Sequence, residues 1–120
     1  IVVVMMGTND VLAQNWNETR FIRDYTRLID KLQVVYKRVI VLLSPPINTD
    51  KQYSKFIMPV INGQLHKIVR SVATSLNAEV VDTFNALGGA ERSRPTAFLH
   101  DDPLHLSPEG MWIVAKLVAQ

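Results

Sequence analysis

Residues 1–10 read Ile-Val-Val-Val-Met-Met-Gly-Thr-Asn-Asp, an apolar run that ends on four turn-forming residues. The run does not alternate with polar residues, so it predicts a β-strand over residues 1–6 that is buried on both faces, as in a parallel sheet. A glycine at the end of the strand allows the backbone a sharp exit. The polar residues that follow therefore fall at the carboxyl end of a strand, where such sheets bind ligands.

Two further apolar segments, 39–43 and 79–84, predict strands, and a helical pattern lies between each strand and the next. The order strand, helix, strand, helix, strand, helix predicts an α/β fold in three layers, with a parallel sheet and helices on both faces. Three strands make a very small sheet of this kind, and the apolar strand 1–6 would be an uncovered edge. The chain also begins with Ile inside a strand-like run. We therefore expect further strands, from an upstream half of the same protein or from another polypeptide.

Capping residues mark where the helices begin and end. Asn17 predicts the start of an amphipathic helix of about five turns. Pro59 and Asn77 mark the first turn and the end of a second helix, along which Gly63 is a weak point. Ser107, followed by a proline, predicts the cap of a last helix.

Composition limits the classes of protein to which the chain could belong. Its 120 residues form one domain at most, and 48% of them are apolar, which excludes disorder. A net charge of +2 without a basic cluster predicts no nucleic-acid partner. The apolar runs are too short to span a membrane, and there is no cysteine. The compartment stays open, with a slight preference for the cytoplasm.

The segment Asp102-Pro103-Leu104-His105 ends a long connection, 85–106, just before the last helix. A neutral histidine serves as a general base at neutral pH once its tautomer is fixed. A carboxylate that accepts from its Nδ1–H fixes that tautomer and stabilises the imidazolium. The spacing favours Asp102 for this role, with Asp101 as a rival. The alternative is a polar surface loop that carries an incidental histidine.

The segment Gly7-Thr8-Asn9-Asp10 suits a second catalytic role. Asn9 at the sheet edge would present its amide NH₂ as a donor to a tetrahedral oxyanion. Asp10 is expected to fix the loop by a bond to backbone. The alternative is an ordinary turn, because all four residue types favour turns.

Together the two motifs resemble the later part of SGNH (GDSL-type) hydrolases. The resemblance runs from the strand before Gly7 to the helix that begins in the segment Leu106-Ser107-Pro108-Glu109-Gly110. It implies that residues 1–120 are the C-terminal part of a single domain with a flavodoxin-like sheet, holding three of about five strands. It also implies that Asn9, with Gly7, belongs to the oxyanion hole, that His105 is the base and that Asp102 is its orienting acid.

Residues 41–46, Val-Leu-Leu-Ser-Pro-Pro, also resemble a strand-end segment of small ester hydrolases related to isoamyl acetate esterases. The family's Gly-Asp-Ser block, which carries the nucleophile, has no counterpart here. Neither does the family's second block, whose glycine N–H joins the oxyanion hole. Ser44 lies at a strand end but runs into two prolines, whereas an exposed nucleophile needs a sharp turn into a helix. Pro103 stands where the family often has a small residue. We therefore expect the nucleophile to come from outside this segment.

The sequence thus predicts a serine-type carboxylic-ester hydrolase that acts on a small ester, without cofactor or metal, and that is inactive as this segment alone. Ile47, Phe98 and Leu104 are candidates for the wall of an acyl pocket. The alternative, that each only packs in the core, is equally open. Three alternatives stay open. They are a non-catalytic binding or assembly module, an acyltransferase with the same site, and a split enzyme whose upstream half is a separate chain.

Overall fold

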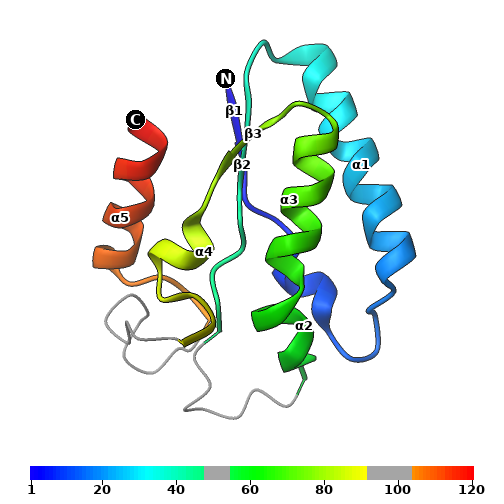
Figure 1. Cartoon of the computed structure of the whole chain (residues 1–120), viewed down its shortest axis with the longest axis vertical. Coiled ribbons are helices and arrows are strands. Elements are labelled where there is room, and N and C mark those ends of the chain that lie inside the picture. Colours follow the sequence, from blue (N-terminus) through cyan, green and yellow to red (C-terminus); the bar gives the residue numbers. More distant parts are fainter. Residues whose placement is uncertain (48–54, 92–103) are drawn as a thin grey trace.

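The computed structural model describes residues 1–47, 55–91 and 104–120. Its sheet has three parallel strands in the order β1-β2-β3: β1 (Val2–Val4), β2 (Val39–Leu42) and β3 (Glu79–Val81). Figure 1 shows helices on both sides of this sheet. The predicted α/β architecture is confirmed.

Five helices and two 3-10 turns accompany the strands in the described parts of the chain. They are η1 (Thr8–Val11), α1 (Glu18–Val35), α2 (Met58–Gly63), α3 (Leu65–Ser75), α4 (Thr83–Ala86), η2 (Gly89–Glu91) and α5 (Pro108–Ala119). In Figure 1, α1 and α3 cover one side of the sheet and α5 lies on the other. No described helix combines the length and the apolarity needed to cross a membrane.

The predicted helix starts are confirmed by hydrogen bonds. The side chain of Asn17 accepts from the backbone N–H of Arg20 at 2.8 Å, which caps α1. The hydroxyl of Ser107 accepts from the N–H of Gly110 at 3.1 Å, which caps α5. Each side-chain oxygen pairs a backbone donor that the first helical turn would otherwise leave unpaired. Asn77 follows α3 with φ of 54°, the left-handed conformation that ends helices.

The predicted second helix is two helices in the structure. α2 ends at Gly63 and α3 begins at Leu65, with Gln64 between them at φ −121° and ψ −39°. The break follows the glycine that the sequence marks as a weak point. It turns the short α2 away from α3, toward the lower end of the sheet in Figure 1.

The predicted third strand is too long. Backbone pairing ends at Val81, and Asp82 then caps α4, with its carboxylate accepting from the N–H of Asn85 at 3.0 Å. Thr83 and Phe84 are therefore helical and not extended. The cap competes with the ladder for the backbone, and here the cap prevails.

The core lies between the sheet and the pair α1 and α3. Every residue of β2 is buried, as predicted for a central parallel strand. The prediction that the first strand is buried on both faces is wrong: Val4 is 6% exposed, but Val3 is 43% exposed. β1 is the edge of the described sheet, and β2 is its only strand neighbour among the described residues.

Candidate active site

The turn after β1 is built on a glycine that no other residue could replace without strain. Gly7 has φ of +123°, and a Cβ placed on it would lie 3.2 Å from Phe21 Cζ and 3.3 Å from Leu65 Cδ1. Its carbonyl accepts from the N–H of Asp10 at 3.1 Å, which closes the η1 turn. Asn9 is thereby held at the carboxyl end of β1, with its side chain exposed.

Asn9 and His105 line one pocket of about 290 Å³, although they come from opposite ends of the chain. The wall is completed by the end of β1, the segment after β2 and the residues just before α5. Its other lining residues are Met5, Thr8, Pro45, Leu104 and Leu106. The capped start of α5 fixes the segment that carries His105. An amide donor and an imidazole therefore open onto a shared space at the carboxyl edge of the sheet.

The other predicted site residues fall in different places. Leu104 lines the pocket, half-buried, whereas Gly7 is buried behind it. Ile47 is only 1% exposed and lies in the core, where Asn62 holds its backbone N–H and C=O at 2.8 and 3.1 Å. The structure therefore gives Ile47 a packing position. Phe98 and Asp102 lie outside the described residues.

Ser44 is buried at the end of β2. It is 1% exposed, and its hydroxyl donates to the carbonyl of Met6 at 3.2 Å. A nucleophilic serine must present its Oγ to the substrate beside a base. Ser44 instead links the ends of β1 and β2, one residue before Pro45 of the pocket wall.

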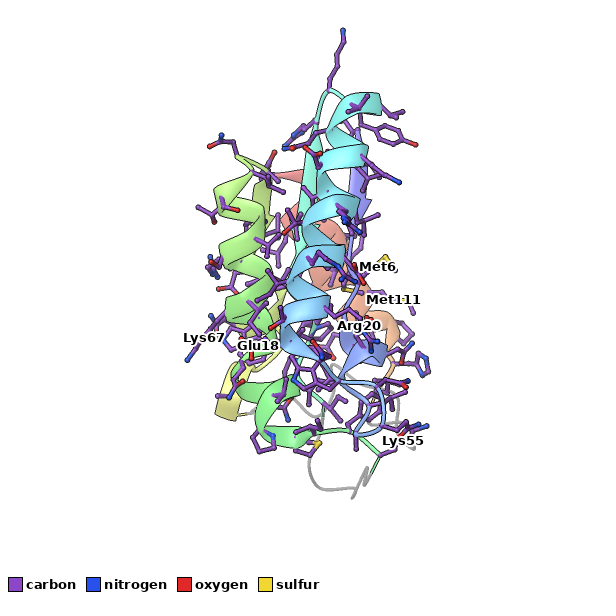
Figure 2. The ribbon with its side chains drawn as sticks, turned by 90° about the vertical axis from the view of Figure 1, so that its right-hand side faces the viewer. Met6, Glu18, Arg20, Lys55, Lys67 and Met111 are labelled. Atoms are coloured by element: carbon purple, nitrogen blue, oxygen red, sulfur yellow. The ribbon has the colours of Figure 1, made fainter. Side chains whose placement is uncertain are left out.

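A second pocket, of about 350 Å³, adjoins the first through Asn9. It lies beside the first turns of α1, where Met6 and Arg20 flank it (Figure 2). Its base is Tyr25, 4% exposed, whose hydroxyl is buried and meets no hydrogen-bond partner among the described residues. Burial raises the pKa of Tyr25 to about 12, and the charge of Asp10 adds to this. From its spacing, Tyr25 falls on the apolar face of the predicted first helix. That spacing gives no sign of a role for its hydroxyl.

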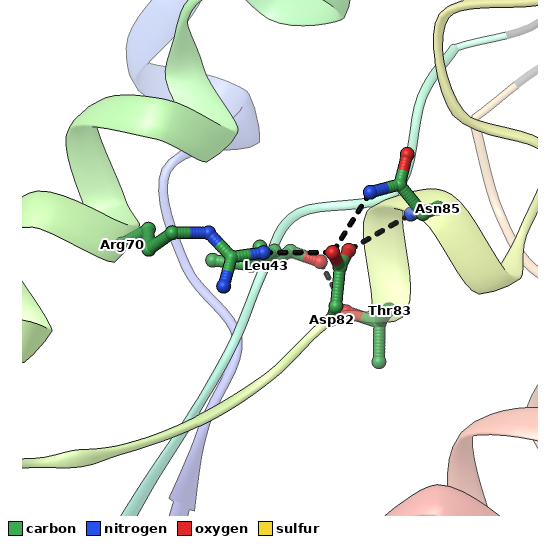
Figure 3. Close-up of polar contacts among 5 residues, drawn as sticks. All are labelled: Leu43, Arg70, Asp82, Thr83 and Asn85. Carbon is green, nitrogen blue, oxygen red and sulfur yellow. Dashed lines mark hydrogen bonds and ion pairs between the residues drawn. The ribbon is translucent and has the colours of Figure 1, made fainter.

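A polar cluster lies at the carboxyl end of β3 (Figure 3). The carboxylate of Asp82 accepts from Arg70 at 2.7 Å and from the Asn85 side chain at 2.8 Å. Burial opposes ionisation of Asp82, but the hydrogen bonds from Asn85 and the charge of Arg70 outweigh it, so its pKa is lowered. The hydroxyl of Thr83 donates to the carbonyl of Leu43. This cluster joins α3, α4 and the end of β2.

Among the residues the structure describes, no three His, Asp or Glu side chains gather closely enough to hold a metal ion. The chemistry on view is that of an imidazole, an amide and the backbone at a strand-end pocket. This set suits acyl transfer, in which a base moves a proton and a fixed donor stabilises an oxyanion.

A parallel sheet with helices on both faces and a pocket at its carboxyl edge defines the class of doubly wound, three-layer α/β domains. Within that class, the chain belongs to the GDSL-like lipase/acylhydrolase family, whose model matches residues 1–113. The resemblance drawn from the Gly-Thr-Asn-Asp and Asp-x-x-His motifs is thereby confirmed. No curated protein matches the chain.

Solved structures share this fold at low sequence identity. Axe2, an acetylxylan esterase from Geobacillus stearothermophilus, superposes with a TM-score of 0.74 at 21% identity, over 97% of this chain and 56% of Axe2. A lipase/acylhydrolase from Enterococcus faecalis gives 0.77 at 22% identity, over 97% and 57%. A peptidoglycan O-acetylesterase gives 0.77 at 15% identity, over 98% and 35%. The chain thus spans about half the length of the first two proteins.

Proposed function

We propose that this chain carries the base and one oxyanion donor of a serine-type ester hydrolase, and that the serine nucleophile comes from outside the segment. The observation that supports this most strongly is the pocket that Asn9 and His105 share. Membership of an acylhydrolase family supports ester hydrolysis in general. Axe2 and the peptidoglycan O-acetylesterase, which share this fold, are both esterases, and this agrees with the proposal.

In this proposal each residue has one task. His105 takes the proton of the serine hydroxyl as its oxygen attacks the ester carbonyl, and the amide of Asn9 donates to the oxyanion. His105 then gives that proton to the departing alcohol, which leaves an acyl-enzyme. Water, deprotonated by the same imidazole, attacks the acyl carbon. The bond to the serine oxygen breaks, that oxygen takes the proton back from His105, and the carboxylic acid leaves. Asp102 would accept from Nδ1–H and fix the tautomer, and Gly7 would set the turn that presents Asn9.

The pocket favours a small ester. Its volume of about 290 Å³ is at the lower end of the range for ligand pockets, and Met5, Leu104 and Pro45 give it apolar walls. These features suit a short acyl group. The reaction needs no metal or cofactor, because proton transfer and oxyanion binding both come from side chains.

The open edge of β1 suits the polypeptide that would supply the nucleophile. Val2 donates its N–H to Arg38 on the β2 side at 2.9 Å. Successive residues of a strand point their backbone groups in opposite directions, so the N–H and C=O of Val3 face the open edge. Met6 continues this edge and is 56% exposed. An added strand would cover this apolar surface and end beside Asn9.

A complementation experiment tests the proposal. The chain, alone and mixed with a polypeptide that supplies the upstream Gly-Asp-Ser strands, is treated with a fluorophosphonate probe and a short-chain aryl ester. We expect serine labelling and hydrolysis only in the mixture. His105→Ala should lower the rate by about 10³-fold or more, and Asn9→Ala by about 10²- to 10³-fold.

Matched variants make the result specific. Asn15→Ala removes an amide that lines only the second pocket, and it should leave the rate within about twofold. Absence of labelling in the mixture would contradict the proposal and favour a non-catalytic binding module. Ester product formed with an added alcohol, in place of free acid, would show an acyltransferase.

A further inference from the structure

Two hydroxyl groups continue the hydrogen bonding of the sheet beyond the ends of its strands. In a parallel pair, every second residue donates its N–H to one partner residue and accepts from the N–H two positions further on. Val2 donates to Arg38 in this way, with Val2 opposite Val39. The same register, carried forward, would have the carbonyl of Met6 accept from the N–H of residue 44. The bond is present, but the donor is the hydroxyl of Ser44.

The same replacement occurs between β2 and β3. Leu43 donates its N–H to the carbonyl of Val81 at 3.2 Å. The next rung would bring the N–H of residue 83 to the carbonyl of Leu43. Instead, the hydroxyl of Thr83 is the donor, as Figure 3 shows.

The reason lies in the path of the chain. Strand β2 ends at Leu42, two residues before Ser44, and Thr83 opens α4, so both residues lie beyond the regular ladder. A hydroxyl on Cβ still reaches back to the carbonyl. Ser44 and Thr83 are 1% and 0% exposed, and the bond from Thr83 to Leu43 is itself buried, whereas the carbonyl of Met6 belongs to a residue that is 56% exposed. Without these hydroxyls, the buried carbonyl of Leu43 would lose its partner, and the carbonyl of Met6 would lose its bond to the end of β2, which is unfavourable.

We propose that Ser44 is a positioning residue for Asn9. The carbonyl that it holds belongs to the peptide bond between Met6 and Gly7, where the chain enters the turn that carries Asn9. Thr83 in turn holds Leu43, the residue before Ser44. A line of contacts therefore runs from α4 through the end of β2 to the oxyanion donor. The catalytic meaning of this line rests on the proposed function, because it requires that role for Asn9.

Amide hydrogen exchange, followed by NMR on the full chain, tests the positioning directly. The reporter is the N–H of Asp10, which closes the turn on Gly7, compared with the amides of β2 in the same protein. Ser44→Ala removes only the hydroxyl. We expect exchange at Asp10 to accelerate about fivefold relative to β2, the effect of one lost hydrogen bond. Ser44→Thr, which keeps a hydroxyl, should restore the slower exchange.

Ser75→Ala is the matched control, because Ser75 also donates its hydroxyl to a backbone carbonyl, that of Val72 at 2.7 Å, but within α3. Ser75→Ala should leave unchanged the ratio of the exchange rate at Asp10 to the rates of the β2 amides. Should Ser44→Ala not fold, the pair Thr83→Val and Thr83→Ser gives the same comparison one step further back. An unchanged ratio in Ser44→Ala, or in Thr83→Val, would overturn the proposal.

Kinetics of the complemented esterase test the catalytic meaning. Ser44→Ala should lower kcat about fivefold with KM unchanged, and Ser44→Thr should recover it. Faster exchange at Asp10 with an unaltered kcat would overturn the link to Asn9. If the complemented wild-type chain shows no hydrolysis, the proposed function fails, and the exchange ratio still decides whether Ser44 positions the turn.

Discussion

The imidazole of His66 lies flat against the ring of Phe84, with ring centroids 3.8 Å apart and an angle of 6° between the planes. Its Nδ1 is buried and meets no hydrogen-bond partner among the described residues. Burial lowers the pKa of His66, and the charges of Lys67 and Arg70 act in the same direction against that of Asp82. The neutral form of His66 is therefore the one that fits between α3 and α4.

This contact predicts a pH-dependent stability. The folded pKa of His66 lies below the ordinary value of 6.5, so the unfolded chain binds this proton more readily. The contribution of neutral His66 to the free energy of unfolding is complete above about pH 6.5. It is lost as the pH falls through the lower pKa of the folded state. His66→Phe keeps a ring against Phe84 without the titration. Urea unfolding between about pH 5 and 7 should show a shallower decline for the variant.

Thr74→Ala, an exposed change on the same helix, should keep the wild-type dependence of unfolding free energy on pH. Equal slopes for wild type and His66→Phe would contradict the role of His66. So would a steeper decline in the variant.

Two glycines should respond in opposite directions to the same substitution. Gly7→Ala forces a side chain into a left-handed conformation and against Phe21 and Leu65, so we expect a loss of about 1–3 kcal/mol in the free energy of unfolding. Gly63 lies in α2, and a Cβ there would meet nothing within 4 Å. Gly63→Ala should therefore raise that free energy by about 0.5–1 kcal/mol. Urea denaturation measures both, and a neutral Gly7→Ala would contradict the strained turn.

Asn62 should be sensitive to any change of its amide. It is 5% exposed, and it pairs with both the N–H and the C=O of Ile47 in the segment that follows Pro46. Asn62→Ala leaves two buried backbone groups without partners, so we expect a loss of about 2–4 kcal/mol in unfolding free energy. Asn62→Asp keeps an acceptor for the N–H but sets an oxygen against the carbonyl. Gln64→Ala, an exposed neighbour without a capping bond, should change stability by less than about 0.5 kcal/mol.

How well the fold was predicted depends on the range of each interaction. Asn17 and Ser107 cap their helices through bonds that span three residues, so local sequence was sufficient. The ending of β3 was misjudged because Phe84 continues the apolar pattern, while the capping carboxylate of Asp82 has no periodic signal. The break after Gly63 shows the same limit, since a weak helix position does not reveal whether the helix stops there.

The candidate site shows the same dependence. The topology of parallel strands alone predicted that Asn9 and the segment before α5 would share one edge, and both line one pocket. Ile47 was a candidate for the wall of that pocket, with packing as the alternative, and its partner is Asn62, a contact between different elements that periodicity does not encode. The hydroxyl of Tyr25 was missed for a similar reason, because its helical spacing matches that of an apolar residue.

The open edge of β1 leads to a last prediction, on association. Val3 is 43% exposed and its backbone groups face outward, so two copies of the isolated chain have a strand edge to pair through. We expect the average mass in sedimentation equilibrium to rise with concentration. Val3→Lys should suppress this rise, because a charged side chain on an edge strand opposes pairing with another strand.

Val34→Lys is the matched control for this edge. It makes the same chemical change at a residue that is 84% exposed near the end of α1, away from any strand edge. If apolar exposure alone drove association, Val34→Lys would suppress it at least as strongly as Val3→Lys, since Val34 is the more exposed. If the edge drives it, only Val3→Lys acts. Val3→Lys should then also weaken complementation by the polypeptide that carries the serine. That polypeptide and a second copy of the chain would pair with the same edge of β1.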